Sequence, residues 1–444
     1  MQVGDAAEKV ELQKEVRDFL VDDEGTIFEL GYSPLAASPH FFIGYTPAGE
    51  VLTVPAIRTG SKLILPLGGA MVAKGVIRLP SEATPYGTDV ELIALVRQFI
   101  HKYVALSPFG EQLATYYVLL TWVYDQFDVL PYLRYQGDWG CGKSRALQTV
   151  GNLCYRATFA SGATTSSPVF RCIDAFRGTL VLDEADLKDS QSHTDLIKIL
   201  NCGYMRGFPV IRSEVKGKSY EPMAFDVYGP KLIATRKKFQ DRALESRCFT
   251  EKMDFSMRPD VPITLPDSFD EEALEIRNRL LMWRFRKWGQ VKLDSTLKLP
   301  PVEPRLKQVA TPLLSLMDDS AVRERVVGLL KDYNRKLIED RRQSADAEVL
   351  SALVYLHDQE EKEKPRIKEI ADRVNASRGV TDKTISARKV GYIVGDVLGL
   401  EKKEDRDGWY VVWSEERVTQ LCEKYGLIED ERTGCGHVDF VDVA

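Results

Sequence analysis

The sequence has few cysteines, and they are scattered singly. Seven occur among 444 residues, which is an odd number, and no CxxC pair is present. Disulfide frameworks and zinc ribbons need paired cysteines, so the composition argues against both classes. We interpret the cysteines as free thiols.

A long hydrophobic run is also missing. The longest nearly uncharged apolar stretch is Leu113–Tyr124, which is shorter than the ~20 residues that a membrane helix needs. Residues 1–19 carry mixed charges and no apolar core of a signal peptide. We therefore expect a soluble, cytoplasmic protein without a membrane partner.

An excess of positive charge is lacking as well. Sixty basic residues stand against sixty-six acidic ones, which gives a formal net charge of −6. Any binding of nucleic acid must therefore come from local basic surfaces. Apolar residues make up 44% of the chain and charged residues 28%, as in globular proteins, and the length suggests about three domains.

The strongest motif that is present is GDWGCGKS, which matches the phosphate-binding pattern GxxxxGK[ST]. An apolar strand pattern at Tyr132–Tyr135 precedes it, and a helical pattern at Arg145–Leu153 follows. In such a loop the backbone N–H groups and the helix N-terminus surround phosphates, the lysine reaches the β- and γ-phosphates, and the last hydroxyl ligates Mg²⁺. The sequence thus predicts that ATP and Mg²⁺ are bound by Gly137, Gly140, Cys141, Gly142, Lys143 and Ser144.

A second motif follows at a suitable distance along the chain. The apolar strand Thr179–Leu182 ends in Asp183 and Glu184. Two carboxylates at the end of a buried strand are costly unless they have a role. As a Walker B motif, Asp183 holds Mg²⁺ and Glu184 polarises the attacking water. The alternative is a strand that runs out into an acidic surface turn.

A third strand, Lys231–Thr235, ends in a hydroxyl that is a candidate for positioning the water. Arg242 and Arg247 follow it, and either arginine is a candidate for donation to a neighbouring subunit, where it would stabilise the charge of phosphoryl transfer. We favour Arg247. The alternative is that both form surface ion pairs, which contribute ~0–1 kcal/mol each.

In this order, the motifs GDWGCGKS, LVLDEAD, KLIAT and ALESRC resemble those of AAA+ ATPases. The sequence looks most like MCM-like and superfamily 3-like replicative helicases, especially those of phages and of mobile elements such as staphylococcal cassette chromosomes. The resemblance covers roughly residues 90 to 420. It implies an α/β P-loop core with a parallel sheet, a helical lid, and a ring of subunits, expected to be a hexamer.

The resemblance also carries individual residues. ALESRC is similar to a segment whose arginine acts in trans, which supports Arg247, and Pro304–Val309 is similar to the lid segment with a second sensor, which points to Arg305. Three departures stand beside it. Thr235 replaces a usual asparagine, the N-terminal region has no zinc-ligand pattern, and no primase-like region precedes the ATPase. A primase or initiator would then be a separate partner.

Local basic segments indicate where DNA would bind. Residues 209–225 predict a β-hairpin with Lys216 and Lys218 at its turn, and the resembled helicases carry a DNA-gripping hairpin at this place. The alternative is an ordinary solvated turn. Residues 231–247 add six basic residues against two acidic ones.

The C-terminal pattern predicts a winged helix. Helices at Ala347–His357 and Ile367–Ala376 are followed by a third at Lys383–Leu398, N-capped by Asp382, and then by two short strands. The third helix would contact DNA through Lys383, Arg388 and Lys389. The alternative is protein contact, favoured by the acidic turn with Glu404, Asp405 and Asp407.

We expect five parts along the chain: a small α+β domain (1–87) that begins with a helix around Val10–Leu20, an AAA+ core (88–265), a helical lid (266–343), a winged helix (344–428) and an acidic tail (429–444). The expected function is an ATP-dependent DNA helicase or translocase for replication of a mobile element or phage. Two alternatives stay open, an initiator or loader that acts as an ATP switch on duplex DNA and a protein remodeller that does not need DNA.

Overall fold

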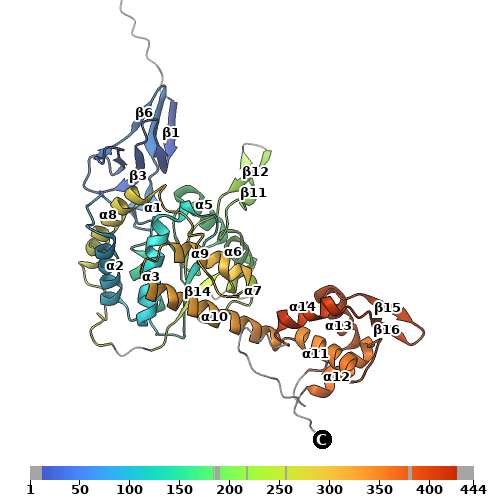
Figure 1. Cartoon of the computed structure of the whole chain (residues 1–444). Coiled ribbons are helices and arrows are strands. Elements are labelled where there is room, and N and C mark those ends of the chain that lie inside the picture. Colours follow the sequence, from blue (N-terminus) through green and yellow to red (C-terminus); the bar gives the residue numbers. More distant parts are fainter. Residues whose placement is uncertain are drawn as a thin grey trace, which may run out of the picture. The chain divides into compact units, whose positions relative to one another are not determined.

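The computed structural model describes residues 13–183, 185, 191–216, 219–255, 258–378 and 383–427. The chain divides into two compact units, Met1–Val327 and Gly328–Ala444 (Figure 1). The boundary between them lies within helix α10 (Ser320–Arg342). Within the described ranges, no helix combines the length and the apolar character needed to cross a membrane.

The first unit is built on a five-stranded sheet in which all neighbouring strands run parallel. The strand order is β14-β8-β13-β10-β9. The central strands are buried along nearly their whole length, as expected for strands covered on both faces. The expected α/β class is therefore confirmed. The strands are β8 (Tyr132–Gln136), β9 (Thr158–Ala160), β10 (Leu180–Leu182), β13 (Lys231–Thr235) and β14 (Cys248–Lys252).

Helices cover both faces of this sheet, because successive side chains of a strand point to opposite sides. On one face, α4 (Lys143–Gly151) packs against β8, β10 and β13. On the other face, Leu180, Leu182 and Ile233 pack with α5 (Ser166–Phe176) and α6 (Gln191–Cys202). The sheet is thus enclosed, and its carboxyl edge is the place where loops gather.

Further helices of this unit surround the sheet. The two expected before it are present as α2 (Asp89–Tyr103), which begins with a capping box of Thr88 and Glu91, and α3 (Pro108–Trp122). A β-hairpin, β11 (Val210–Lys216) and β12 (Ser219–Phe225), projects between α6 and β13 (Figure 1). The remaining helices are α7 (Arg242–Glu245), α8 (Phe269–Lys287) and α9 (Pro304–Ser315).

Two small sheets form the N-terminal end of the described chain. The helix expected around Val10–Leu20 is wrong, since β1 (Gln13–Arg17) and β2 (Phe19–Val21) are strands, and residues 1–12 lie outside the described ranges. β1 pairs with β7 and β2 with β3, so backbone pairing outweighs the helical spacing of the apolar residues. The two sheets also contain β3 (Ile27–Tyr32), β4 (His40–Tyr45), β5 (Val51–Val54), β6 (Ile57–Thr59) and β7 (Lys62–Pro66), and the short helix α1 (Ala70–Ala73) follows.

A buried ionic cluster joins these sheets to the rest of the unit. The carboxylate of Glu29 in β3 accepts hydrogen bonds from Arg156 Nη2 (2.5 Å), Tyr155 Oη (2.8 Å) and Arg284 Nε (2.6 Å). Both arginines and Glu29 are 1% exposed. Burial by itself lowers the pKa of Arg284, but the carboxylates of Asp125 and Glu29 outweigh it and hold that pKa above its ordinary value. The N-terminal sheets are therefore fixed to α8 and to the segment after α4.

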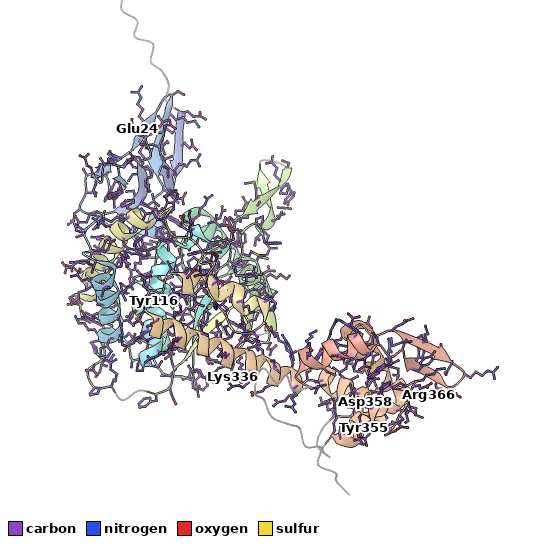
Figure 2. The ribbon with its side chains drawn as sticks, viewed as in Figure 1. Glu24, Tyr116, Lys336, Tyr355, Asp358 and Arg366 are labelled. Carbon is purple, nitrogen blue, oxygen red and sulfur yellow. The ribbon has the colours of Figure 1, made fainter. Side chains whose placement is uncertain are left out.

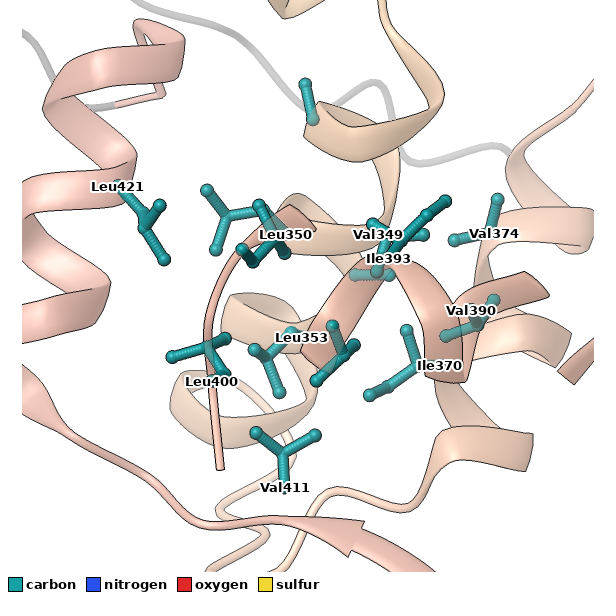
Figure 3. Packing of buried hydrophobic residues seen from close by; sticks show 14 of the residues in the cluster. Val349, Leu350, Leu353, Ile370, Val374, Val390, Ile393, Leu400, Val411 and Leu421 are labelled. Carbon is teal, nitrogen blue, oxygen red and sulfur yellow. The ribbon is translucent and has the colours of Figure 1, made fainter. Parts of the chain in front are cut away.

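The second unit has a hydrophobic core of its own, to which each of its helices contributes (Figure 3). Leu353, Ile370, Val390 and Val411 come from four different elements and meet in this core. The elements are α11 (Ala345–Asp358), α12 (Ile367–Ser377), α13 (Ala387–Tyr392), the π-helical turn Ile393–Val397, β15 (Lys402–Asp405), β16 (Gly408–Val411) and α14 (Glu415–Tyr425).

The third helix of this unit begins later than expected. Its N-cap is Ser386, whose hydroxyl accepts a hydrogen bond from the Lys389 backbone N–H (3.3 Å). The predicted cap, Asp382, lies outside the described residues. Lys383 therefore precedes the helix, whereas Arg388 and Lys389 lie in its first turn and are exposed.

Candidate nucleotide site and candidate DNA-contacting elements

The predicted phosphate-binding loop connects the end of β8 to the start of α4. Gly140 (φ +74°) and Gly142 (φ +88°) are in the left-handed region, which disfavours other residues. A Cβ atom at Gly137 would lie 2.1 Å from the carbonyl oxygen of Met253. The three glycines are thus required by the backbone path, and this path presents the N-terminus of α4 to the loop.

The side chains of this loop converge on one backbone oxygen. Lys143 Nζ donates to the carbonyl oxygen of Asp138 (2.5 Å), and Cys141 Sγ donates to the same oxygen (2.9 Å). Ser144, the second residue of α4, is exposed. The ammonium group of Lys143 is therefore held across the loop, where a phosphate oxygen would compete for it as an acceptor.

The strands next to β8 bring two more predicted residues to the same edge of the sheet. Asp183 follows β10, and its backbone N–H donates to Ala160 O (3.0 Å), while Glu184 lies outside the described residues. Thr235 ends β13, and its carbonyl oxygen accepts a hydrogen bond from the Gly137 N–H (3.2 Å). Because parallel strands end at one edge, the loop, Asp183 and Thr235 are neighbours.

The hydroxyl of Thr235 is buried without a hydrogen bond. The residue is 1% exposed, and Oγ1 has no partner among the residues that the structure describes. A buried hydroxyl that lacks a partner is costly unless a ligand or water satisfies it. Its place beside the phosphate-binding loop fits a polar ligand at this edge.

The candidate arginines differ in their exposure. Arg247 is 6% exposed, donates from Nη1 to Asn201 Oδ1 (2.6 Å) and lies over the ring of Tyr204 (4.1 Å). A role in a neighbouring subunit would require it to leave this pocket. Arg242, five residues earlier, is exposed, and so is Arg305 in the first turn of α9.

Lys231 does not belong to the basic surface expected over residues 231–247. It is fully buried at the start of β13, and its ammonium group donates to the carbonyl oxygens of Gly203 (2.9 Å), Val227 (2.7 Å) and Gly229 (2.7 Å). Burial lowers the pKa of Lys231 to about 7. This lysine ties together three backbone segments at the edge of the sheet opposite the phosphate-binding loop.

Sequence reasoning missed a contact between Trp139 and Arg236. Trp139 lies within the phosphate-binding loop and is 76% exposed, and the guanidinium of Arg236 lies 4.9 Å from its ring centre. Arg236 directly follows Thr235, so the contact links the loop to the end of β13. A large aromatic among the glycines of such a loop is a signal that the sequence already contains.

The predicted hairpin is present and projects from the unit as β11 and β12. Its strands are antiparallel, and Lys216 pairs with Ser219 through the backbone. The Lys216 side chain and the whole of Gly217 and Lys218 lie outside the described part of the chain. The predicted role of the two lysines therefore stays a prediction.

In the second unit, a groove of about 830 Å³ lies between α12, α13 and the turn of β15 and β16. Its lining includes Arg388, Tyr392 and Trp409 together with acidic residues. Arg366, labelled in Figure 2, pairs with Asp405 (2.7 Å) and Asp407 (3.2 Å) of the acidic turn. The negative charge of that turn is thus partly compensated within the unit.

No family model and no curated protein matches the sequence. Solved structures with similarity to the chain include the apo NrS-1 C-terminal region (305–718), with 9% identity, a TM-score of 0.38, and coverage of 87% of this chain and 95% of that chain. An SCCmec type IV Cch active helicase has 11% identity and a TM-score of 0.38 over 94% and 80% of the two chains. A full-length MCM homolog from Methanopyrus kandleri has 12% identity and a TM-score of 0.37 over 70% and 78%.

Proposed function

We propose that the chain is an ATPase of the AAA+ class that works as a ring-forming DNA helicase. The observation that carries the proposal is the glycine loop between β8 and α4, beside the carboxyl ends of β10 and β13. Ligands of parallel α/β sheets bind at this edge, and loops of this sequence bind the phosphates of nucleoside triphosphates.

The residues around the loop fit ATP and Mg²⁺. The backbone N–H groups from Gly140 to Ser144 would hold the phosphates, and Lys143 would neutralise their charge. Ser144 and Asp183 would hold Mg²⁺, which supplies electrostatic stabilisation of the transferred phosphoryl group when it is bound. The unpaired buried hydroxyl of Thr235 supports a polar ligand here.

The chain's own residues would then activate water and complete the site. Glu184 would orient the attacking water and accept its proton, with Thr235 donating a hydrogen bond toward the γ-phosphate. Arg305 would act from the lid helix α9. For the arginine donated by the next subunit, the motif favours Arg247, whereas exposure favours Arg242.

Oligomerisation would place one hairpin from each subunit around a central channel, and a hexamer is the expected ring. ATP hydrolysis at each interface would move Lys216 and Lys218 along one DNA strand by contacts to phosphates. The second unit would act as a winged helix in which Arg388 and Lys389 on α13, and Lys383 before it, contact duplex DNA. A separate primase or initiator would be a partner in replication of a phage or mobile element.

Strand displacement on a forked DNA duplex with ATP and Mg²⁺ tests the proposal. We expect unwinding by the wild type and none by Lys143→Ala, with Lys237→Ala as the matched control at an exposed lysine outside the loop. ATP hydrolysis without unwinding would refute the helicase. Hydrolysis stimulated by specific duplex DNA would then favour the initiator or loader, and hydrolysis indifferent to DNA would favour the protein remodeller.

A mixing experiment identifies the arginine that acts in trans. Subunits with Lys143→Ala offer an intact arginine, and subunits with Arg242→Ala or Arg247→Ala offer an intact nucleotide site. Mixing the two kinds should restore part of the ATPase activity for the arginine that acts across the interface. If an arginine acts only within its own subunit, mixing will restore nothing.

A further inference from the structure

The hairpin of β11 and β12 has two faces of opposite chemistry. Paired residues of an antiparallel hairpin lie on the same face, and faces alternate along each strand. One face has the pairs Arg212 with Met223 and Glu214 with Glu221. The other face has the pairs Ile211 with Ala224, Ser213 with Pro222 and Val215 with Tyr220, and it contains no charge.

The charged face is directed at the hairpin's own unit. Arg212 pairs with Asp195 of α6 (3.2 Å), and Glu214 pairs with Arg171 of α5. Below them, Phe225 is buried against Phe170, with ring centres 4.7 Å apart. These contacts hold the hairpin on α5 and α6.

The uncharged face is open to solvent along its whole length. All six of its residues are exposed, and the largest side chains, Ile211, Val215 and Tyr220, are 66%, 69% and 76% exposed. This is the reverse of a surface hairpin, which ordinarily turns its apolar face to the core. A contiguous exposed apolar strip of this kind indicates an interaction site.

The size of the strip argues against a subunit interface as its main role. Seven residues per strand at ~3.3 Å each, on two strands, give a strip on the order of 200 Å². A stable protein interface needs about 800 Å² from each partner. Bases of a single strand are small and flat, and they stack on exposed aromatic rings.

Charge complementarity favours nucleic acid over an apolar ligand. Val215 and Tyr220 are paired next to the turn, and the turn sequence between them includes Lys216 and Lys218. A polyanion held by these lysines would bring its bases over the adjoining uncharged strip. Duplex DNA keeps its bases stacked inside, so only a single strand can offer them to such a strip.

We propose that the uncharged face, with Tyr220 at its outer end, stacks on the bases of single-stranded nucleic acid. The proposal rests on the proposed function and deepens it, because the hairpin then contacts bases as well as phosphates. This contact selects single strands by their accessible bases and does not read their sequence.

The test measures binding of the full chain to an oligothymidylate strand and to an abasic strand of equal length over a series of salt concentrations. We expect the wild type to bind the thymidylate strand more tightly than the abasic one. Tyr220→Leu should bind the thymidylate strand about 10-fold more weakly, with no change on the abasic strand. Tyr220→Phe should bind as the wild type, since it keeps the ring.

Two controls separate stacking from charge. A double variant, Lys216→Gln with Lys218→Gln, should weaken binding to both strands and lower the salt slope by about 1, whereas Tyr220→Leu should keep the slope. Met223→Ala alters an apolar residue of the opposite face and should change neither affinity.

Three results would overturn the proposal. The first is equal binding of the thymidylate and abasic strands by the wild type. The second is an equal loss on both strands for Tyr220→Leu. The third is a change of oligomer size by Tyr220→Leu in sedimentation without DNA, which would assign the strip to a neighbouring subunit. If the wild type binds no single strand at all, the proposed function fails as well.

Discussion

The cluster around Glu29 makes a quantitative prediction about how the N-terminal sheets are held. Glu29 is the carboxylate that both Arg156 and Arg284 share, and all three are 1% exposed. Removing one partner of a buried ion pair costs about 3–5 kcal/mol, because a buried charge loses its compensation. Here Asp18 still pairs with Arg156 (2.9 Å) and Asp125 with Arg284 (2.7 Å). We therefore expect Glu29→Gln to cost about 3 kcal/mol, at the lower end of that range.

The assay is urea unfolding followed by tryptophan fluorescence. Trp288 reports on this junction, because its ring lies 5.3 Å from Phe19 and its Nε1 donates to Asp125 (2.9 Å). The midpoint should fall with little change in the denaturant slope. Glu15→Gln is the matched control, since Glu15 pairs with Lys62 (3.2 Å) in the same sheets at an exposed position and should leave the midpoint unchanged.

Equal midpoints for Glu29→Gln and Glu15→Gln would refute the reasoning. The N-terminal sheets would then be held by apolar packing, for example by Phe28, Phe42 and Phe176, and the ionic cluster would contribute nothing measurable.

Three further predictions follow from single residues. Gly137→Ala should abolish ATP binding because its Cβ would meet a backbone carbonyl, whereas Gly140→Ala has open space and should cost only about 1–2 kcal/mol of strain, as judged by titration calorimetry. The unfolding free energy of the wild type should rise between pH 7 and 10.5, because the unfolded chain there binds a proton that folded Lys231 has released, and Lys231→Met should lose this rise in urea titrations. A non-hydrolysable ATP analogue should change the fluorescence of the exposed Trp139 against Arg236, and an unchanged difference spectrum for Trp139→Phe would contradict this.

Local signals were sufficient for the phosphate-binding loop and its sheet. The glycines of GDWGCGKS occupy left-handed or crowded positions, so the loop's path follows from residue chemistry alone. The strands at β8, β10 and β13 are apolar runs between polar turns, and such runs form buried parallel strands. These features need only neighbours within a few residues.

Burial and pairing between distant segments were decided by the tertiary structure. Val16 and Leu20 have helical spacing, yet their segments pair with strands that are remote in sequence for Val16 and a short turn away for Leu20. Lys231 and Arg247 look like surface cations in the sequence, and only the fold supplies the carbonyl oxygens and the Asn201 amide that bury them.

The hairpin shows where the two levels meet. Its strands and its turn follow from alternation and from Lys-Gly-Lys, which the sequence contains. Which face is open does not follow, because the strand pattern offers two faces and a core can cover either one. Ion pairs of Arg212 and Glu214 with α6 and α5 decide it, and they leave Val215 and Tyr220 exposed. Sequence thus determines elements formed by near neighbours, and the tertiary structure determines which of their surfaces remain open for function.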